Sequence, residues 1–133
     1  MTGHDTELPD WYDDEEFKPL FWMRQLMNSL PVWREFDEEL ADVLSGGLMV
    51  IEREMGEFFR ERDINRGRIL ISTAYELLND LVAVAREKNE NFSLSEDLPE
   101  DSSEFMYKVA GMIIHMLIIG LEKETKKAQA ERN

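Results

Sequence analysis

Thirteen consecutive residues near the end of the chain, from Val109 to Leu121, carry no charge. A helix that crosses a membrane needs about 20 apolar residues, so this run is too short to be one. A helix that is apolar around its whole circumference belongs either in the centre of a bundle or in an interface between subunits. The run therefore predicts a helical domain with this segment at its centre or at its contact with another chain.

The rest of the chain repeats its apolar residues at helical spacing, in which positions i, i+3, i+4 and i+7 share one face. The predicted helices cover residues 19–30, 33–44, 48–62, 70–89 and a stretch that begins at 101. Pro31 and the pair Gly46–Gly47 are expected to end the first two helices. The last helix opens at the capping-box-like sequence Asp101-Ser-Ser-Glu104. The predicted fold class is all-α, a compact bundle of four to five helices.

The apolar stripes also predict the core. Its expected members are Trp33, Phe36, Met55, Phe58, Leu77, Leu81, Met112 and Met116. In the last helix, Met112 and Met116 are expected on the packed face, and Ile114, Ile118 and Leu121 on another face. Because monomers rarely expose an apolar patch of that size, we expect a two-fold homodimer through this helix. The alternative is a monomer with the helix at its centre.

The common catalytic motifs are absent from the sequence. His115 has no carboxylate three or four positions away, so we interpret it as a buried, hydrogen-bonded histidine and not as a ligand or general base. The chain contains no HExxH, P-loop, GxGxxG or GxSxG motif. Without cysteine it has no disulfide, no thiol nucleophile and no cysteine-ligated metal. We therefore expect no catalytic residues.

The 133 residues contain 29 Asp and Glu against 15 Lys and Arg, which gives a formal net charge of −14. This length fits one domain, which we place at residues 18–128. Residues 1–17 are expected to form an acidic, flexible N-terminal arm, and residues 129–133 a frayed C-terminus. The negative charge argues against direct binding to nucleic acid or to an anionic membrane. The acidic start lacks the pattern of a signal peptide, so we expect a cytoplasmic protein.

Two of the predicted helices carry paired acidic residues. One contains Arg53-Glu54-Met55-Gly56-Glu57 with Glu61 four residues further, and the next contains Glu76-Leu77-Leu78-Asn79-Asp80. Over residues 48–94 this arrangement resembles the MazG-like all-α NTP pyrophosphohydrolases, which have ExxE on one helix and ExxD on the next. The resemblance implies carboxylates that hold Mg²⁺ and position a nucleoside triphosphate for attack by water. Glu54, Glu57 and Glu76 match three of the four family ligands.

The fourth position of this motif differs from the family. Asn79 stands where the family has Asp, and Asp80 is one position away, on a different side of the helix. At about 100° per residue, Glu76 and Asn79 lie about 150° from the apolar stripe of their helix and point away from the core. Carboxylates that bind a metal inside a bundle project inward. We therefore predict no cofactor and no metal site. Under the enzymatic alternative, the Mg²⁺ ligands would be Glu54, Glu57, Glu61, Glu76 and Asp80.

Two further segments concentrate acidic residues. The expected interaction residues are Asp10, Asp13, Asp14, Glu15 and Glu16 in the arm, and Glu96, Asp97, Glu100 and Asp101 in the loop before the last helix. Such surfaces attract basic partners and speed their association. The sequence thus predicts a non-catalytic interaction protein that binds a basic protein surface. One specific form is a nucleic-acid mimic of viral type that occupies the nucleic-acid channel of a host enzyme. The alternative is a Mg²⁺-dependent nucleoside triphosphate pyrophosphohydrolase.

Overall fold

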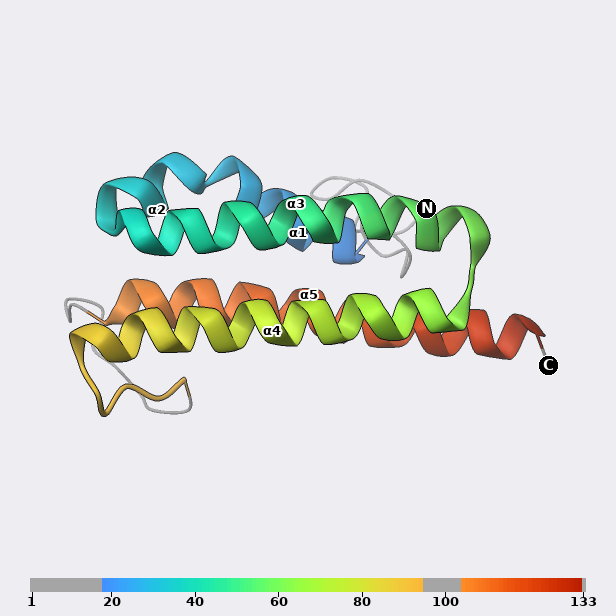
Figure 1. The fold of residues 1–133 in the computed structure, drawn as a ribbon. Helices are drawn as coiled ribbons and strands as arrows, with labels where there is room; N and C mark the ends of the chain where they lie inside the picture. The colour runs from blue at the N-terminus through green and yellow to red at the C-terminus, as the bar shows by residue number, and fades with distance from the viewer. Residues whose placement is uncertain (1–17, 95–103, 133) are drawn as a thin grey trace, which may run out of the picture.

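The structure is a computed structural model that describes residues 18–94 and 104–132. Every regular element in these residues is a helix: α1 (Lys18–Asn28), α2 (Leu30–Phe36), α3 (Glu38–Glu61), α4 (Ile64–Lys88) and α5 (Phe105–Arg132). The helices form two layers, with α1, α2 and α3 in one layer and α4 and α5 in the other (Figure 1). The predicted all-α bundle is confirmed.

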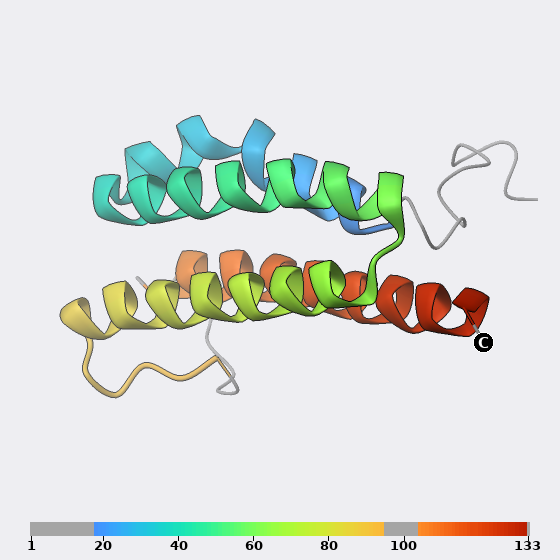
Figure 2. The same cartoon turned by 45° about the vertical axis from the view of Figure 1, so that its right-hand side comes forward.

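The helices occupy four positions, each antiparallel to its neighbour along the chain. α1 and α2 share the first position, and α3, α4 and α5 fill the other three (Figure 2). α3 packs on α4 and α4 on α5, while α1 packs on α5, so the first helix also meets the last. This is the up-down-up-down arrangement of a four-helix bundle.

The sequence predicts one helix over 33–44, but the structure interrupts it at Asp37, between α2 and α3. Asp37 has an extended backbone, with φ −158° and ψ 109°. Its carboxylate accepts hydrogen bonds from the backbone N–H groups of Glu39 and Leu40, at 3.0 and 3.4 Å. This N-cap satisfies donors that the first turn of a helix leaves without partners. The apolar pattern does not indicate this interruption, because it continues on both sides of Asp37.

α3 runs without interruption through Gly46 and Gly47, so the helix end predicted at this pair is wrong. A Cβ atom at Gly47 would lie 2.7 Å from Leu77 Cδ1 on α4, whereas a Cβ atom at Gly46 would meet nothing within 4 Å. Gly47 therefore serves the close approach of two helices. Glycine is suited both to the close approach of two backbones and to the end of a helix, so the sequence does not distinguish the two roles.

The core fills the space between the two layers. Five of the predicted core residues are buried: Trp33, Met55, Phe58, Leu77 and Leu81. Phe36, by contrast, is 36% exposed, and its ring contacts Tyr107 edge-on at a centroid distance of 4.9 Å. Its assignment to the core is wrong because α2 ends at Phe36 and the chain changes direction there.

α5 packs on the bundle through a face other than the predicted one. The buried aliphatic side chains at its centre are Ile114, Leu117, Ile118 and Leu121. Met112 and Met116 are 58% and 40% exposed, and His115 is exposed as well. The prediction of a buried His115 is therefore wrong, and so are the core positions of both methionines and the exposed face at Ile114, Ile118 and Leu121. An uncharged helix has no amphipathic pattern that would identify its inward face.

α5 continues to Arg132, through residues that the sequence predicts to fray. Ala128 is buried, and Glu131 accepts a hydrogen bond from Arg62 Nε at 3.1 Å. By length and composition alone, Phe105–Glu131 is the one helix in the described part of the chain that could cross a membrane. This is weak evidence, because the core helix of a bundle has the same length and composition.

Candidate functional site

A hollow lies on the surface where the glycine pair of α3 faces α4. Its volume is about 430 Å³, and we call it the α3–α4 groove. The lining residues are Asp42, Val43, Gly46, Gly47, Val50, Thr73, Glu76, Leu77 and Asp80. Three of these nine residues are carboxylates and none is basic. The groove therefore places negative charge beside apolar side chains.

Two of the groove's carboxylates have no basic partner among the residues described. Asp42 accepts a hydrogen bond from Arg34 Nη1 at 3.0 Å, but Glu76 and Asp80 form no ion pair within residues 18–94 and 104–132. These two residues are exposed and lie one turn apart on α4. Like charges at this spacing destabilise a helix by about 0.2–0.5 kcal/mol. A cation from another molecule would therefore lower the free energy of this surface.

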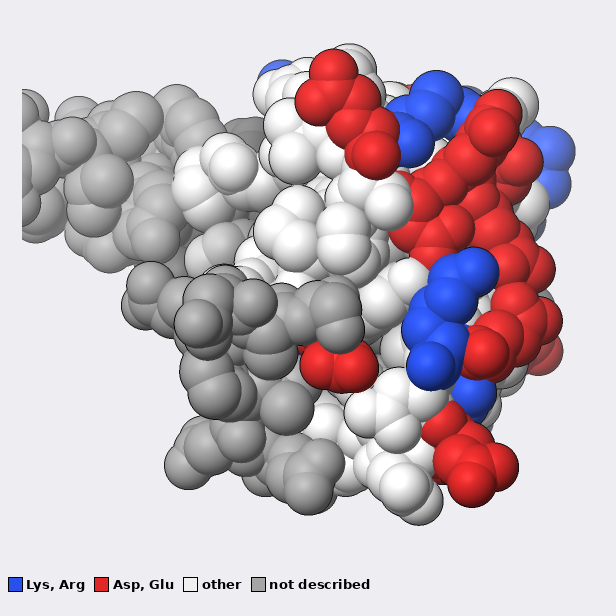
Figure 3. All heavy atoms as spheres, turned by 90° about the vertical axis from the view of Figure 1, so that its left-hand side faces the viewer, with Lys and Arg blue, Asp and Glu red and all other residues white. Residues whose placement is uncertain are grey.

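A second pair of carboxyl groups meets near the N-terminal end of α3. The hydrogen bond between Glu39 and Glu87, partial desolvation and the charge of Glu87 together raise the pKa of Glu39, although Lys88 acts in the opposite direction. Two carboxyl groups close enough to share a hydrogen bond repel each other when both are ionised. Figure 3 views this end of the bundle and shows acidic side chains gathered along the side formed by α3 and α4, with a few Lys and Arg among them.

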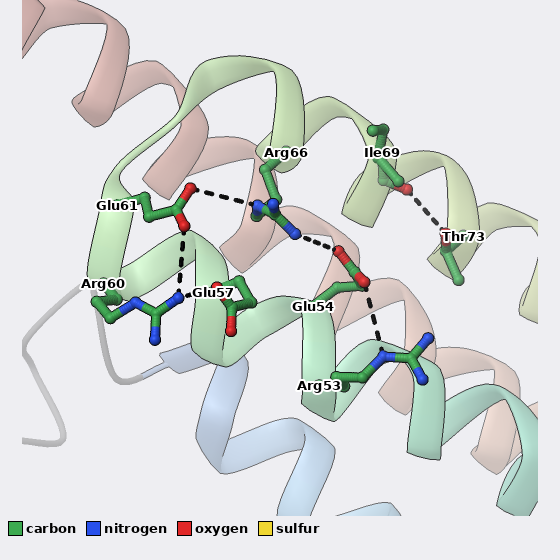
Figure 4. Close-up of polar contacts among 8 residues, drawn as sticks. All are labelled: Arg53, Glu54, Glu57, Arg60, Glu61, Arg66, Ile69 and Thr73. Atoms are coloured by element: carbon green, nitrogen blue, oxygen red, sulfur yellow. Dashed lines mark hydrogen bonds and ion pairs between the residues drawn. The ribbon is translucent and has the colours of Figure 1, made fainter.

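The acidic cluster at the other end of α3 is neutralised by arginines (Figure 4). Glu54 accepts a hydrogen bond from Arg66 Nη1 of α4 at 2.8 Å. Glu57 and Glu61 both accept hydrogen bonds from Arg60, and Glu61 also lies 3.7 Å from Arg66 Nε. Each of these three carboxylates is therefore paired with a guanidinium group of the same chain.

The carboxylates that the MazG-like resemblance would bring together do not meet. Arg66 of α4 bonds to Glu54, whereas Leu77, the neighbour of Glu76, faces Gly47. Since a helix rises 1.5 Å per residue, Glu76 lies about 10 Å along α3 from the level of Glu54. In residues 18–94 and 104–132, no three His, Asp or Glu side chains are placed to hold a metal ion. The geometry therefore adds no support to the enzymatic alternative.

The residues predicted as the interaction surface lie outside the described part of the chain. This applies to Asp10, Asp13, Asp14, Glu15 and Glu16 and to Glu96, Asp97, Glu100 and Asp101. Their role stays a prediction. The carboxylates of the α3–α4 groove are not among these predicted residues. The signal for them in the sequence is a pair of acids one turn apart, but the same sequence predicts a helix end at the glycines that line the groove.

Two hydrogen bonds that join residues far apart in the sequence are also absent from the sequence predictions. Glu124 is fully buried in α5 and accepts a hydrogen bond from Arg62 Nη1 at 3.1 Å. Arg62 ends α3 in a left-handed conformation with φ 56°. Tyr107 of α5 donates a hydrogen bond to the Asp37 carboxylate. The partners lie 62 and 70 residues apart in the chain, so no local spacing indicates them.

Searches against protein-family models, curated proteins and solved structures find no match for this chain. The proposals that follow therefore rest on its residues and their geometry.

Proposed function

We propose that this protein is a non-catalytic interaction protein that binds a basic protein surface, with the α3–α4 groove as its contact site. The observation that carries the proposal is the placement of Glu76 and Asp80. Both are exposed, both line the groove, and neither has a basic partner among the described residues. The acids at the opposite end of α3, by contrast, are already paired with arginines.

A lysine or arginine side chain fits this groove in both charge and chemistry. Its apolar stem can pack beside Val43 and Val50, while its charged head reaches the carboxylates at the edge. Binding would thus place an opposite charge beside Glu76 and Asp80, two carboxylates that repel each other one turn apart.

The net charge of −14 supports the same proposal at longer range, because an acidic molecule attracts basic partners before contact. The acidic residues in 1–17 and 95–103 would extend the surface. In the more specific form, nucleic-acid mimicry, duplex DNA and this protein would compete for one site on the partner.

Titration of the ¹⁵N-labelled protein with a lysine-rich peptide tests the proposal. We expect the amide signals of Gly46, Gly47, Glu76 and Asp80 to shift more than those of α5. The affinity should fall between low and physiological salt, because exposed charges are screened within about 8–10 Å. An acidic peptide of the same length should cause no shifts.

A matched pair of double variants separates the groove from general charge attraction. Glu76→Gln/Asp80→Asn should weaken peptide binding several-fold. Glu35→Gln/Glu52→Gln removes the same charge from exposed positions outside the groove and should have little effect. Equal losses in both variants, or no binding by the wild type, would refute the groove as the contact site.

A further inference from the structure

The outer face of α5 carries an apolar groove that is separate from the α3–α4 groove. It measures about 420 Å³ and is lined by Leu78, Leu94, Gly111, Met112, His115 and Met116. Met112 and Met116 are 58% and 40% exposed, and Tyr75, on the same side of α4 as Leu78, is 42% exposed. An apolar groove beside exposed methionine side chains is a surface that a protein partner can cover.

The charges that flank this groove are arranged symmetrically about His115. Lys108 and Glu122 each lie seven residues from His115, and Glu104 and Lys126 each lie eleven residues from it. Lys108, Glu122 and Lys126 belong to α5, and Glu104 directly precedes it, with its carbonyl oxygen accepting a hydrogen bond from Lys108 N–H at 3.2 Å. Separations of seven and eleven residues therefore return to nearly the same face of a helix with 3.6 residues per turn. In each of these two pairs, the residue on one side of His115 in the sequence is acidic and the residue on the other side is basic.

We propose that this face binds a second copy of the chain, with the two α5 helices antiparallel and His115 next to the two-fold axis. Antiparallel pairing about His115 places Lys108 opposite the partner's Glu122, and Glu104 opposite the partner's Lys126. Because the symmetry repeats each contact, four pairs of opposite charges result. Parallel pairing would instead place every charge opposite its own copy, which repels.

The shape of the surface is also self-complementary. Met112 and Met116 both project into solvent beside the groove that they help to line. In a two-fold contact the same patch serves both subunits, and antiparallel pairing about His115 places the partner's Met116 level with Ile114, within the span of the groove, so Met116 of each copy can enter the groove of the other. An unbranched methionine side chain adapts to such a groove more easily than a branched one.

This proposal corrects the dimer expected from the sequence, which used Ile114, Ile118 and Leu121, all of them now placed in the core. It also uses a face other than the one proposed to bind a basic partner. The two proposals are therefore tested by different variants.

Light scattering coupled to size exclusion tests the dimer. We expect a mass twice the 15.6 kDa of one chain. Met112→Glu should halve this mass, whereas Met49→Glu, which changes a 67% exposed methionine on α3, should leave it unchanged. A 15.6 kDa wild type overturns the proposal, as does a dimer that Met112→Glu leaves intact. A monomer that sediments with phospholipid vesicles would assign the face to a membrane and would also overturn it.

Charge reversal tests the antiparallel register. Lys108→Glu places two acids opposite each other and should weaken the dimer, while Lys108→Glu/Glu122→Lys should restore it. Failure of the double variant to recover the dimer mass, when its helical circular dichroism equals that of the wild type, contradicts the register.

A cysteine in place of His115 tests the position of the two-fold axis without changing a buried residue. The chain has no cysteine, and His115 is exposed, so His115→Cys introduces a single accessible thiol. Mild oxidation with copper phenanthroline should join two such chains through one disulfide. Met49→Cys should stay uncoupled at the same concentration. Equal coupling of both variants, or none at His115→Cys, overturns the placement of His115 beside the axis.

Discussion

Asp37 connects three helices, α2 through its backbone N–H and α3 and α5 through its carboxylate. It follows α2, caps α3 through the N–H groups of Glu39 and Leu40, and accepts a hydrogen bond from Tyr107 of α5. Partial burial raises the pKa of Asp37, but the hydrogen bonds from Tyr107 and from the two N–H groups outweigh it and hold the pKa below its ordinary value. Burial and the bond to Asp37 raise the pKa of Tyr107. The ionised form of Asp37 therefore stabilises the bundle.

We expect Asp37→Ala to lower the free energy of unfolding by about 1–2 kcal/mol, as for other N-cap residues. Asp37→Asn should cost less, because the amide oxygen still accepts hydrogen bonds. The pKa of Asp37 is lower in the folded than in the unfolded chain, where it lies near 3.8. Its charge therefore contributes stability above that pH and loses the contribution as the pH falls through the folded value.

Urea unfolding as a function of pH measures this contribution. The difference in unfolding free energy between wild type and Asp37→Asn should be constant near neutral pH and shrink in acid. A difference that does not change with pH would show that the charge of Asp37 contributes nothing. Tyr107→Phe serves as a control for the link to α5 and should leave the cap on α3 in place.

Two helical glycines, Gly46 and Gly67, have opposite surroundings. A Cβ atom at Gly46 would meet nothing, whereas at Gly67 it would lie 2.5 Å from Thr125 Oγ1 and 2.9 Å from Phe58 Cε1. Gly46→Ala should raise the free energy of unfolding by about 0.5–1 kcal/mol, because alanine favours a helix interior. Gly67→Ala should lower it by about 1–3 kcal/mol through overpacking where α3, α4 and α5 meet. Denaturant unfolding checks both, and a change of the same sign in both would contradict the packing described here.

The elements differ in how much of them could be predicted from the sequence. The sequence predicts the end of α4 within one residue, because its apolar stripe stops at Ala85 and polar residues follow to Asn89. The same reasoning divides α3 in two, since Gly46–Gly47 permits either a helix end or a close approach. The sequence predicts that α5 exists but not how it is oriented, because residues 109–121 are apolar on all sides.

The candidate site depends on the register between helices, which local spacing does not contain. The sequence offers Glu54 as a possible ligand, but its partner on the next helix is Arg66. Helical spacing points Glu76 away from the core, and this residue is exposed. The hollow beside Glu76 lies where Gly46 and Gly47 of α3 face α4, with Leu77 packed against Gly47, so it depends on residues of different helices.

Over the whole molecule, carboxylates outnumber basic groups by 14. Their mutual repulsion destabilises the compact state, while exposed ion pairs such as Arg34–Asp42 each contribute at most about 1 kcal/mol. We therefore expect the midpoint of thermal unfolding to rise when sodium chloride is increased from low to physiological concentration. Circular dichroism melts at fixed pH measure this shift. A midpoint that falls with salt would indicate that ion pairs contribute more than repulsion.

The contact between Pro19 of α1 and Gly120 of α5 has a consequence for synthesis. About 100 residues separate the end of α1 from the end of α5, and their translation takes roughly 5–20 s at about 5–20 residues per second. During this interval α3 and α4 can pair as neighbours in the chain, but Met23 and Leu26 of α1 lack the helix that later covers them. The bundle closes only when its last helix emerges. Nascent α1 is therefore a segment on which a chaperone would act.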